Sequence, residues 1–438
     1  MRPIAGIAEA DRLAFGVKEN ARRLHRYAYV EQRLLVAFAG HLIGTPEWEM
    51  KYALGRHLWE DSEHATWLRE RLTQLRTSEG AIDHPPDEQL AIMMDEALQA
   101  GDTVELLAGY YGVVKTRLLA AYRRHLAETQ PLVDFPTVRL LRFIIGEEEE
   151  QLVWAGEALA ELTENSDAKA RAAAWQAHLE SYLTAAGGIV GDEPRPAEFP
   201  RPDRSLSPAK LPKLPARDSR FALCGEFLDN GYAKANTAER SILMARVRLN
   251  EMAAVENVAS TLYQTTGMPW DYYHDLARHL WDEVRHSCFG QVWLEQAGRR
   301  AEEFPVRMSI TDFYSTLTPL ERYVLLGIAI ENGAMKYPPG KRLEYEWCRD
   351  VAKDALPTVF QDYDWADEVL HAQIARRWVA AQLSPNRRVM QTEADRLRDA
   401  LNAAKPQWTA EDRYAHLDAS TPIDGDKRRS QPVGANDE

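Results

Sequence analysis

The sequence RHLWEDSEHA, residues 56–65, returns later in the chain as RHLWDEVRHS, residues 278–287. In each copy a tryptophan is followed by two acidic residues, and a histidine stands three positions after the second acid. Positions i and i+3 share one face of an α-helix, so each copy can direct a carboxylate and an imidazole to the same point. The repeat predicts two related helical units. The two pairs are Asp61 with His64, and Glu283 with His286.

The correspondence between the halves extends beyond this block. Trp48 and Trp270 match at the same spacing of 222 residues, and three further segments align with small gaps: YVEQRLLVAF with AVENVASTLY, VELLAGYY with IENGAMKY, and EEEEQ with DEVLH. This pattern, spread over several expected helices, indicates an internal duplication. It places Glu31 opposite Glu256, Glu105 opposite Glu331, Glu148 opposite Glu368, and Gln151 opposite His371.

Length and composition limit the class of protein. A chain of 438 residues exceeds a typical single core, which favours two domains. The net charge of −14 argues against nucleic acid or an anionic membrane as the main partner. Three scattered cysteines predict a reducing compartment, and no apolar stretch resembles a signal peptide or a membrane span. We therefore expect a cytoplasmic protein.

Apolar residues recur at helical spacing and strand-like alternation is hard to find, so the fold class is predicted to be all-α. A proline-rich segment, residues 187–219, should form an extended linker. Each half then reads as four long helices, giving helical bundles over residues 15–186 and 220–405. A polar tail, residues 406–438, is expected to be poorly ordered.

The second half carries the stronger candidate site. Glu283 with His286 and Glu368 with His371 are two Glu-x-x-His pairs, and Glu256 and Glu331 lie in apolar helical segments. An ionised carboxylate is costly to bury unless it is paired or bound to a metal. Two single glutamates plus two Glu-x-x-His pairs, one set per helix, resemble the ligand set of the ferritin-like di-iron carboxylate superfamily.

Other interpretations of these residues remain open. A single Glu-x-x-His is more often a solvated helix face, and Glu331 could instead pair with a buried lysine or arginine. The acidic neighbours Asp282 and Asp367 could point inward in place of Glu283 and Glu368. The repeated His57 and His279 could orient a ligand or simply pack in the core.

The first half departs from the superfamily pattern. An aspartate replaces the bridging glutamate, and a glutamine stands where the second histidine belongs. A degenerate copy with a structural role is the favoured interpretation, and a weak or mononuclear metal site is the alternative. The set is Glu31, Asp61, His64, Glu105, Glu148 and Gln151.

The resemblance implies two tandem ferritin-like four-helix bundles, with two iron ions (or Mn/Fe or Mn/Mn) in the second. Glu283 and Glu368 would bridge the metals, while Glu256, Glu331, His286 and His371 would each bind one. The implied activity is an O2-dependent oxidase or oxygenase acting on a small organic substrate, with electrons from an external donor. The alternative is an iron-handling protein or a helical scaffold without catalysis.

Overall fold

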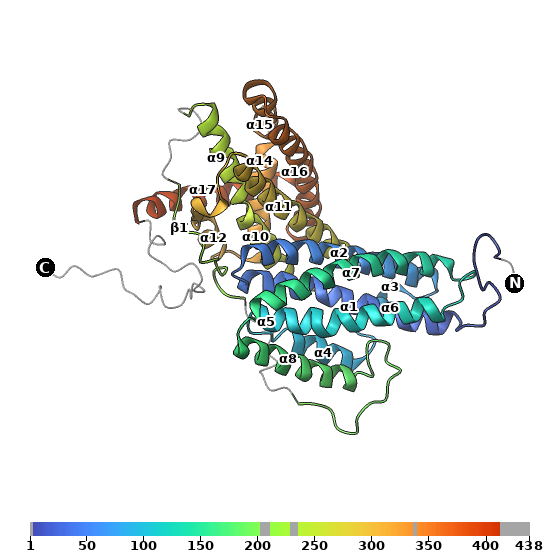
Figure 1. The fold of residues 1–438 in the computed structure, drawn as a ribbon. Coiled ribbons are helices and arrows are strands. Elements are labelled where there is room, and N and C mark those ends of the chain that lie inside the picture. Colours follow the sequence, from blue (N-terminus) through green and yellow to red (C-terminus); the bar gives the residue numbers. More distant parts are fainter. Residues whose placement is uncertain (1–2, 202–210, 228–234, 336–339, 412–438) are drawn as a thin grey trace. The chain divides into compact units, whose positions relative to one another are not determined.

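The protein, described here from a computed structural model, is predominantly helical, as the sequence predicts (Figure 1). The structure describes residues 3–201, 211–227, 235–335 and 340–411. It divides into two compact units. The first unit comprises Met1–Ala37 and Glu60–Lys210, and the second comprises Phe38–Trp59 and Leu211–Glu438.

The first unit is built from helices, several of which begin at ordinary N-terminal signals. Asp87, Asp102 and Asn165 cap three of them through their side chains, and Pro136 stands in the first turn of α7. A π-helix, η1, precedes α6. The elements are α1 (Val17–Gly44), α2 (Trp48–Gln74), α3 (Glu79–Ile82), α4 (Glu88–Ala97), α5 (Thr103–Leu106), η1 (Leu107–Lys115), α6 (Thr116–Glu128), α7 (Phe135–Leu162) and α8 (Ser166–Ala185).

The second unit contains the remaining elements and the tip of the α1–α2 hairpin. Its elements are β1 (Leu223–Cys224), α9 (Thr237–Leu249), α10 (Met252–Gln264), α11 (Trp270–Gln296), η3 (Ala301–Glu303), β2 (Val306–Arg307), α12 (Ser309–Tyr314), α13 (Pro319–Tyr323), η4 (Val324–Glu331), α14 (Asn332–Ala334), α15 (Gly340–Trp347), η5 (Cys348–Ala352), α16 (Ala355–Gln382) and α17 (Arg387–Glu411). The two short strands pair in parallel.

Helix α11 is the centre of the second unit, where it packs against α9, α10 and α16, and η4 packs between α16 and α17. Two glycines permit the closest approaches. A Cβ atom on Gly290 would lie 2.1 Å from the backbone nitrogen of Leu249, and one on Gly327 would lie 2.2 Å from Cβ of Ala375. These positions bring the α9–α10 junction onto α11, and η4 onto α16.

The expected linker contains no helix in its described residues, 187–201 and 211–219, but it is not wholly exposed. Leu214, Ala216 and Arg217 are buried in the second unit. Helix α17 continues to Glu411, so the described start of the expected tail is helical, and residues 412–438 lie outside the described part of the chain.

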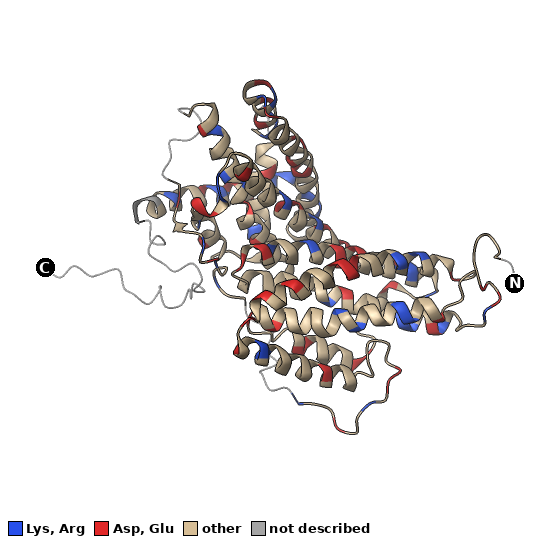
Figure 2. Cartoon of the chain, in the orientation of Figure 1, with Lys and Arg blue, Asp and Glu red and all other residues tan. Residues whose placement is uncertain are grey.

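Charged residues are interspersed along the helices of both units, with acidic and basic positions alternating over short distances (Figure 2). The acidic excess of the sequence is therefore not confined to one helix.

Within the described residues, every helix is too short or too polar to cross a lipid bilayer.

Candidate metal centre

Two helices of the second unit each direct three potential ligands from a single face. On α11 these are His279, Glu283 and His286, and on α16 they are Asp364, Glu368 and His371. Positions i, i+4 and i+7 share one helix face, and α11 packs against α16. All six side chains are buried.

Two further glutamates complete the arrangement. Glu331 is the last residue of the π-helix η4, and an inserted π turn is frequent at functional sites. Glu251 lies at the junction between α9 and α10. The Ser287 hydroxyl donates to the carbonyl of Leu249 at 2.8 Å, which anchors this junction on α11.

The eight side chains form two adjacent groups, in each of which one ligand atom per residue lies within 4.8 Å of the others. Group one contains His279, Glu283, Glu331 and His371, and group two contains Glu251, His286, Asp364 and Glu368. In group one, Nε2 of His279 lies 2.9 Å from Oε1 of Glu331. In group two, Nδ1 of His286 lies 3.4 Å from Oδ1 of Asp364 and 3.5 Å from Oε2 of Glu251.

The carboxylate of Glu283 faces both groups. Its Oε1 atom lies 3.4 Å from Nδ1 of His371 in group one, and its Oε2 atom lies 3.7 Å from Nδ1 of His286 in group two. One oxygen directed to each side is the arrangement that a bridging carboxylate requires. The two groups therefore share Glu283.

Several ligand atoms in these groups are buried without a hydrogen-bond partner among the described residues. Such atoms are costly in a folded protein, because buried polar groups are nearly always paired. A metal ion at each group would satisfy them, so the residues fit two metal ions. The atoms are Nδ1 of His286 and His371, and one carboxylate oxygen each of Glu251, Glu331 and Glu368.

The other ring nitrogens of two histidines are held by carboxylates from the opposite helix. Nε2 of His371, on α16, lies 3.3 Å from Oδ2 of Asp282 on α11, and Nε2 of His286, on α11, lies 3.1 Å from Oδ2 of Asp367 on α16. An acceptor on one ring nitrogen fixes the orientation and leaves the other for a metal. In the pairs Asp282–Glu283 and Asp367–Glu368, the glutamate therefore lies among the potential ligands. The aspartate of each pair positions a histidine.

Group two also contains a lysine. Nζ of Lys341 lies 2.8 Å from Oδ1 of Asp364 and 2.8 Å from Oε1 of Glu368. Burial opposes the charge on this ammonium, but Asp364, Glu368 and Glu251 raise the pKa of Lys341 well above its usual value. A metal in group two would compete with Lys341 for these oxygens.

The predicted ligand Glu256 lies outside both groups. Its carboxylate is buried between Nζ of Lys51, at 2.5 Å, and the guanidinium of Arg217, at 2.5 and 2.8 Å. Burial opposes the charge on Glu256, but these two cations lower its pKa below the usual value. The position expected for Glu256 is taken by Glu251, five residues earlier.

The first unit contains a similar group of four buried residues. Glu31, Asp61, His64 and Glu148 bring one ligand atom each within 4.8 Å of one another. At this place lies the ammonium of Lys115, 2.7 Å from Oδ1 of Asp61 and 2.7 Å from Oε1 of Glu148. Lys115 is the last residue of the π-helix η1, just as Glu331 is the last residue of η4.

In the first unit, as in the second, neighbouring carboxylates contact the side chains of the i+3 positions, here His64 and Gln151. Nε2 of His64 lies 2.7 Å from Oε2 of Glu147, and the Gln151 amide donates to Oε2 of Glu60 at 2.9 Å. Glu105 does not join the group, because its Oε2 atom accepts the backbone N–H of Gly101 at 2.7 Å. The first unit thus repeats part of the arrangement, with the ammonium of Lys115 among its carboxylates.

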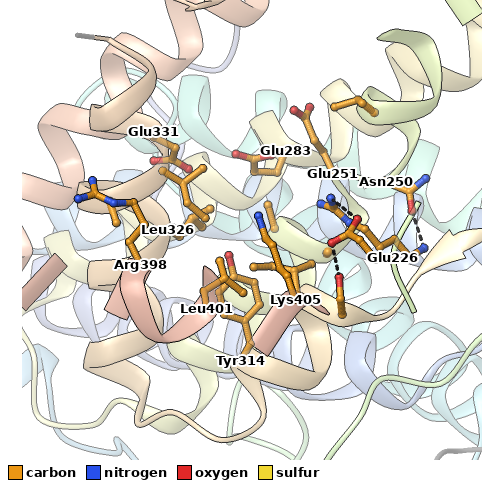
Figure 3. A pocket seen from close by; sticks show the side chains of 18 of the residues that line it. Glu226, Asn250, Glu251, Glu283, Tyr314, Leu326, Glu331, Arg398, Leu401 and Lys405 are labelled. Carbon is orange, nitrogen blue, oxygen red and sulfur yellow. Dashed lines mark hydrogen bonds and ion pairs between the residues drawn. The ribbon is translucent and has the colours of Figure 1, made fainter. Parts of the chain in front are cut away.

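A cavity of about 450 Å³ opens onto the centre of the second unit (Figure 3). Glu251, Glu283, Glu331 and Glu368 line it, so both groups are reached from the same space. Its apolar lining comes from α9, α10, α12, η4 and α17, and α17 also contributes Arg398, Asn402 and Lys405. A volume of this size is typical of a site for a small organic molecule.

Comparison of the chain with protein-family models, curated proteins and solved structures gave no match. Interpretation of the site therefore depends on its geometry. The structure brings together five of the six predicted ligands of the second half, and adds Glu251, Asp364 and His279. The i, i+4, i+7 spacing of the two triplets was the signal that could have identified Asp364 and His279.

Proposed function

We propose that the chain is a ferritin-like non-haem di-iron protein that uses O2 to oxidise a small organic substrate. In this proposal each half is a ferritin-like four-helix bundle, and the second holds the metals. The observation that supports it best is Glu283, which directs one carboxylate oxygen to each of two adjacent ligand groups. Carboxylate bridging between neighbouring metal ions is the feature that unites the ferritin-like di-iron and di-manganese proteins.

The residues divide their roles as follows. Group one would hold one metal ion and group two the other, with Glu283 shared between them. Two iron ions, or Mn/Fe or Mn/Mn pairs, would supply the redox chemistry toward O2, with electrons from an external donor. Asp282 and Asp367 keep Nδ1 of His371 and His286 available, and the apolar walls of the cavity limit access of water.

The test is the metal content per chain after anaerobic loading with Fe(II) and desalting. We expect about two irons in the wild type, loss in Glu331→Ala, and no loss in the control Glu105→Ala, whose carboxylate lies outside the first-unit group. A wild-type protein that retains no metal would contradict the proposal.

The alternative function is iron handling or a scaffold without catalysis. O2 consumption separates the two. An oxidase or oxygenase consumes O2 repeatedly only when its organic substrate and a reductant are present. An iron-handling protein oxidises Fe(II) rapidly without any organic substrate, and a scaffold does neither. The cavity beside the ligand groups favours the enzyme, since iron storage has no need of a largely apolar organic site.

A further inference from the structure

The group of four in the first unit contains buried ligand atoms that the proposed metal chemistry does not use. Glu31, Asp61, His64 and Glu148 are fully buried, and each brings one ligand atom within 4.8 Å of the others. One atom of each side chain has no hydrogen-bond partner among the described residues: Oε2 of Glu31, Oδ2 of Asp61, Nδ1 of His64 and Oε2 of Glu148. Because buried polar atoms are nearly always paired, four such atoms in one group point to a cation bound between them.

The second oxygen of each carboxylate is held by a donor of the first unit. The Tyr122 hydroxyl donates to Oε1 of Glu31 at 2.6 Å. The ammonium of Lys115 donates to Oδ1 of Asp61 and to Oε1 of Glu148, at 2.7 Å in both cases. Each carboxylate is therefore fixed through one oxygen, and its other oxygen remains for a metal ion.

The histidine of this group is oriented in the same way. Nε2 of His64 lies 2.7 Å from Oε2 of Glu147. Nδ1 faces the carboxylates without a hydrogen bond to them, at 3.4 Å from Oε1 of Glu31 and 3.6 Å from Oε1 of Glu148. An acceptor on one ring nitrogen leaves the other for a metal, and the same kind of contact positions the histidine of group two.

The charges and the counterparts in the second unit indicate one ion and not two. The three carboxylates of the group, when ionised, carry three negative charges, and Lys115 supplies one positive charge, so a single divalent cation would make the group neutral. Two ligands of group one have other residues in their place. Lys115 ends η1 as Glu331 ends η4, and Gln151 aligns with His371.

We propose that the first unit binds one divalent transition-metal ion through Glu31, Asp61, His64 and Glu148, and that this ion stabilises the unit without taking part in oxidation. Four fully buried protein ligands are typical of a structural metal site, because a catalytic ion keeps an open position for water or substrate. Carboxylate oxygens with one imidazole suit Mn(II), Fe(II) or Zn(II). The inference does not depend on the metal ions proposed for the second unit.

The ammonium of Lys115 should make this a weak site. Lys115 is fully buried, so its charge stays beside the bound ion and repels it at short range. We therefore expect the ion to exchange freely and to be removed by desalting. It is counted only at equilibrium, and it does not add to the irons that the chain retains after desalting.

The test is an equilibrium titration of the full chain with Mn(II), in which the electron paramagnetic resonance signal of the free ion gives the number of ions bound. Glu31→Gln keeps the size of the side chain and an acceptor for Tyr122 but removes a charged ligand, so it should bind about one ion fewer than the wild type. The control His84→Ala removes an exposed histidine of the same unit that lies outside the group, and it should bind as many ions as the wild type. Circular dichroism checks that both variants are folded.

Hydrogen–deuterium exchange of the wild type locates the ion without any variant. Added Zn(II) should slow exchange in the segments that contain Glu31 and Glu148, because an ion that binds the folded unit opposes its local opening. Equal numbers of bound ions in the wild type and a folded Glu31→Gln, or exchange in these segments that Zn(II) does not change, would overturn the inference. The iron retained after desalting decides the proposed function separately.

Discussion

Asp282 on α11 lies 3.3 Å from Nε2 of His371 on α16, and the partner helix returns the same contact through Asp367 and His286. Each helix thus orients the histidine of the other. Replacing Asp282 with asparagine should lower metal affinity about 10–100-fold while the fold is retained, because outer carboxylates set ligand orientation and basicity. Metal titration followed by elemental analysis measures the effect.

The matched control for this variant is Asp271→Asn, at the exposed start of the same helix, where the carboxylate pairs with Arg377. Its metal affinity should equal that of the wild type. Equal affinities in Asp282→Asn and Asp271→Asn would show that the Asp282–His371 contact has no role in metal binding.

Lys115 should be essential to the stability of the first unit. Its ammonium lies 2.7 Å from an oxygen of Asp61 and of Glu148, and all three side chains are fully buried. Lys115→Met removes that charge and should lower the free energy of unfolding by about 3–5 kcal/mol, the usual cost of breaking a buried ion pair. Added Mn(II) or Zn(II) should restore part of the loss, because the four oxygen and nitrogen ligands then surround a vacated position. Thermal unfolding with and without metal reports both effects, and the exposed Lys169→Met is the control.

Lys341 should act as a competitor for the metal of group two. Because its Nζ atom is 2.8 Å from oxygens of Asp364 and Glu368, a metal ion must displace it. Lys341→Met should raise the affinity of group two for its metal ion about ten-fold. The exposed Arg342→Met should leave this affinity unchanged. A decrease in metal affinity in Lys341→Met would mean that the lysine supports the group instead of competing in it.

Metal binding should release protons near neutral pH. Burial opposes protonation of His286, but Asp364, Asp367 and Glu283 raise its pKa to about 10, and burial raises the pKa of Glu251 to about 7. At pH 7 the metal-free His286 is therefore an imidazolium, with a proton on each ring nitrogen. The proton on Nδ1 must leave before this nitrogen can bind a metal. Affinity should rise with pH up to about 10. Calorimetry in two buffers of different ionisation enthalpy counts the protons, and a pH-independent affinity would contradict the assignment.

Glu256 and Glu251 should have separate roles. Glu256→Gln leaves Lys51 and Arg217 without their buried partner, so we expect a loss of about 3–5 kcal/mol in stability with metal content unchanged. Glu251→Gln should lower the metal content of group two with a smaller effect on stability. Chemical denaturation and elemental analysis of both variants test these separate roles. Loss of metal in Glu256→Gln would mean that Glu256 is a metal ligand after all.

The sequence predicted those members of the two groups that form i, i+3 pairs, but not Asp364 and His279 at the i and i+4 spacing, nor the positions that depend on breaks in the helices. Glu283, His286, Glu368 and His371 were found because an i, i+3 pair occurs twice on amphipathic helices. The error at Glu256 is one of register: α1 and α10 end at Gly44 and Gln264, a difference of 220, which pairs Glu31 with Glu251. The alignment of Glu31 with Glu256 used 225.

The π-helices account for a second difference between the sequence alignment and the structure, the pairing of Glu105 with Glu331. Glu105 was aligned with Glu331, but the residue that ends η1 as Glu331 ends η4 is Lys115. A π turn inserts a residue without changing the apolar character of the segment, so it leaves no mark in a pattern of i, i+3 and i+4 positions. Lys341 was missed for a related reason, since nothing in a surface-like GKRLEYEW helix indicates a buried ammonium.

The terminal residues of η1 and η4 differ in a way that bears on the history of the chain. A change of the first base alone converts a lysine codon into a glutamate codon, so one point mutation can exchange the residue type found at Lys115 for that found at Glu331. After a duplication, a single nucleotide change would have been enough to give one copy a permanent internal cation. That copy could then accept changes such as Gln151 without losing its folded structure, whereas equivalent changes in the second unit would remove a potential metal ligand.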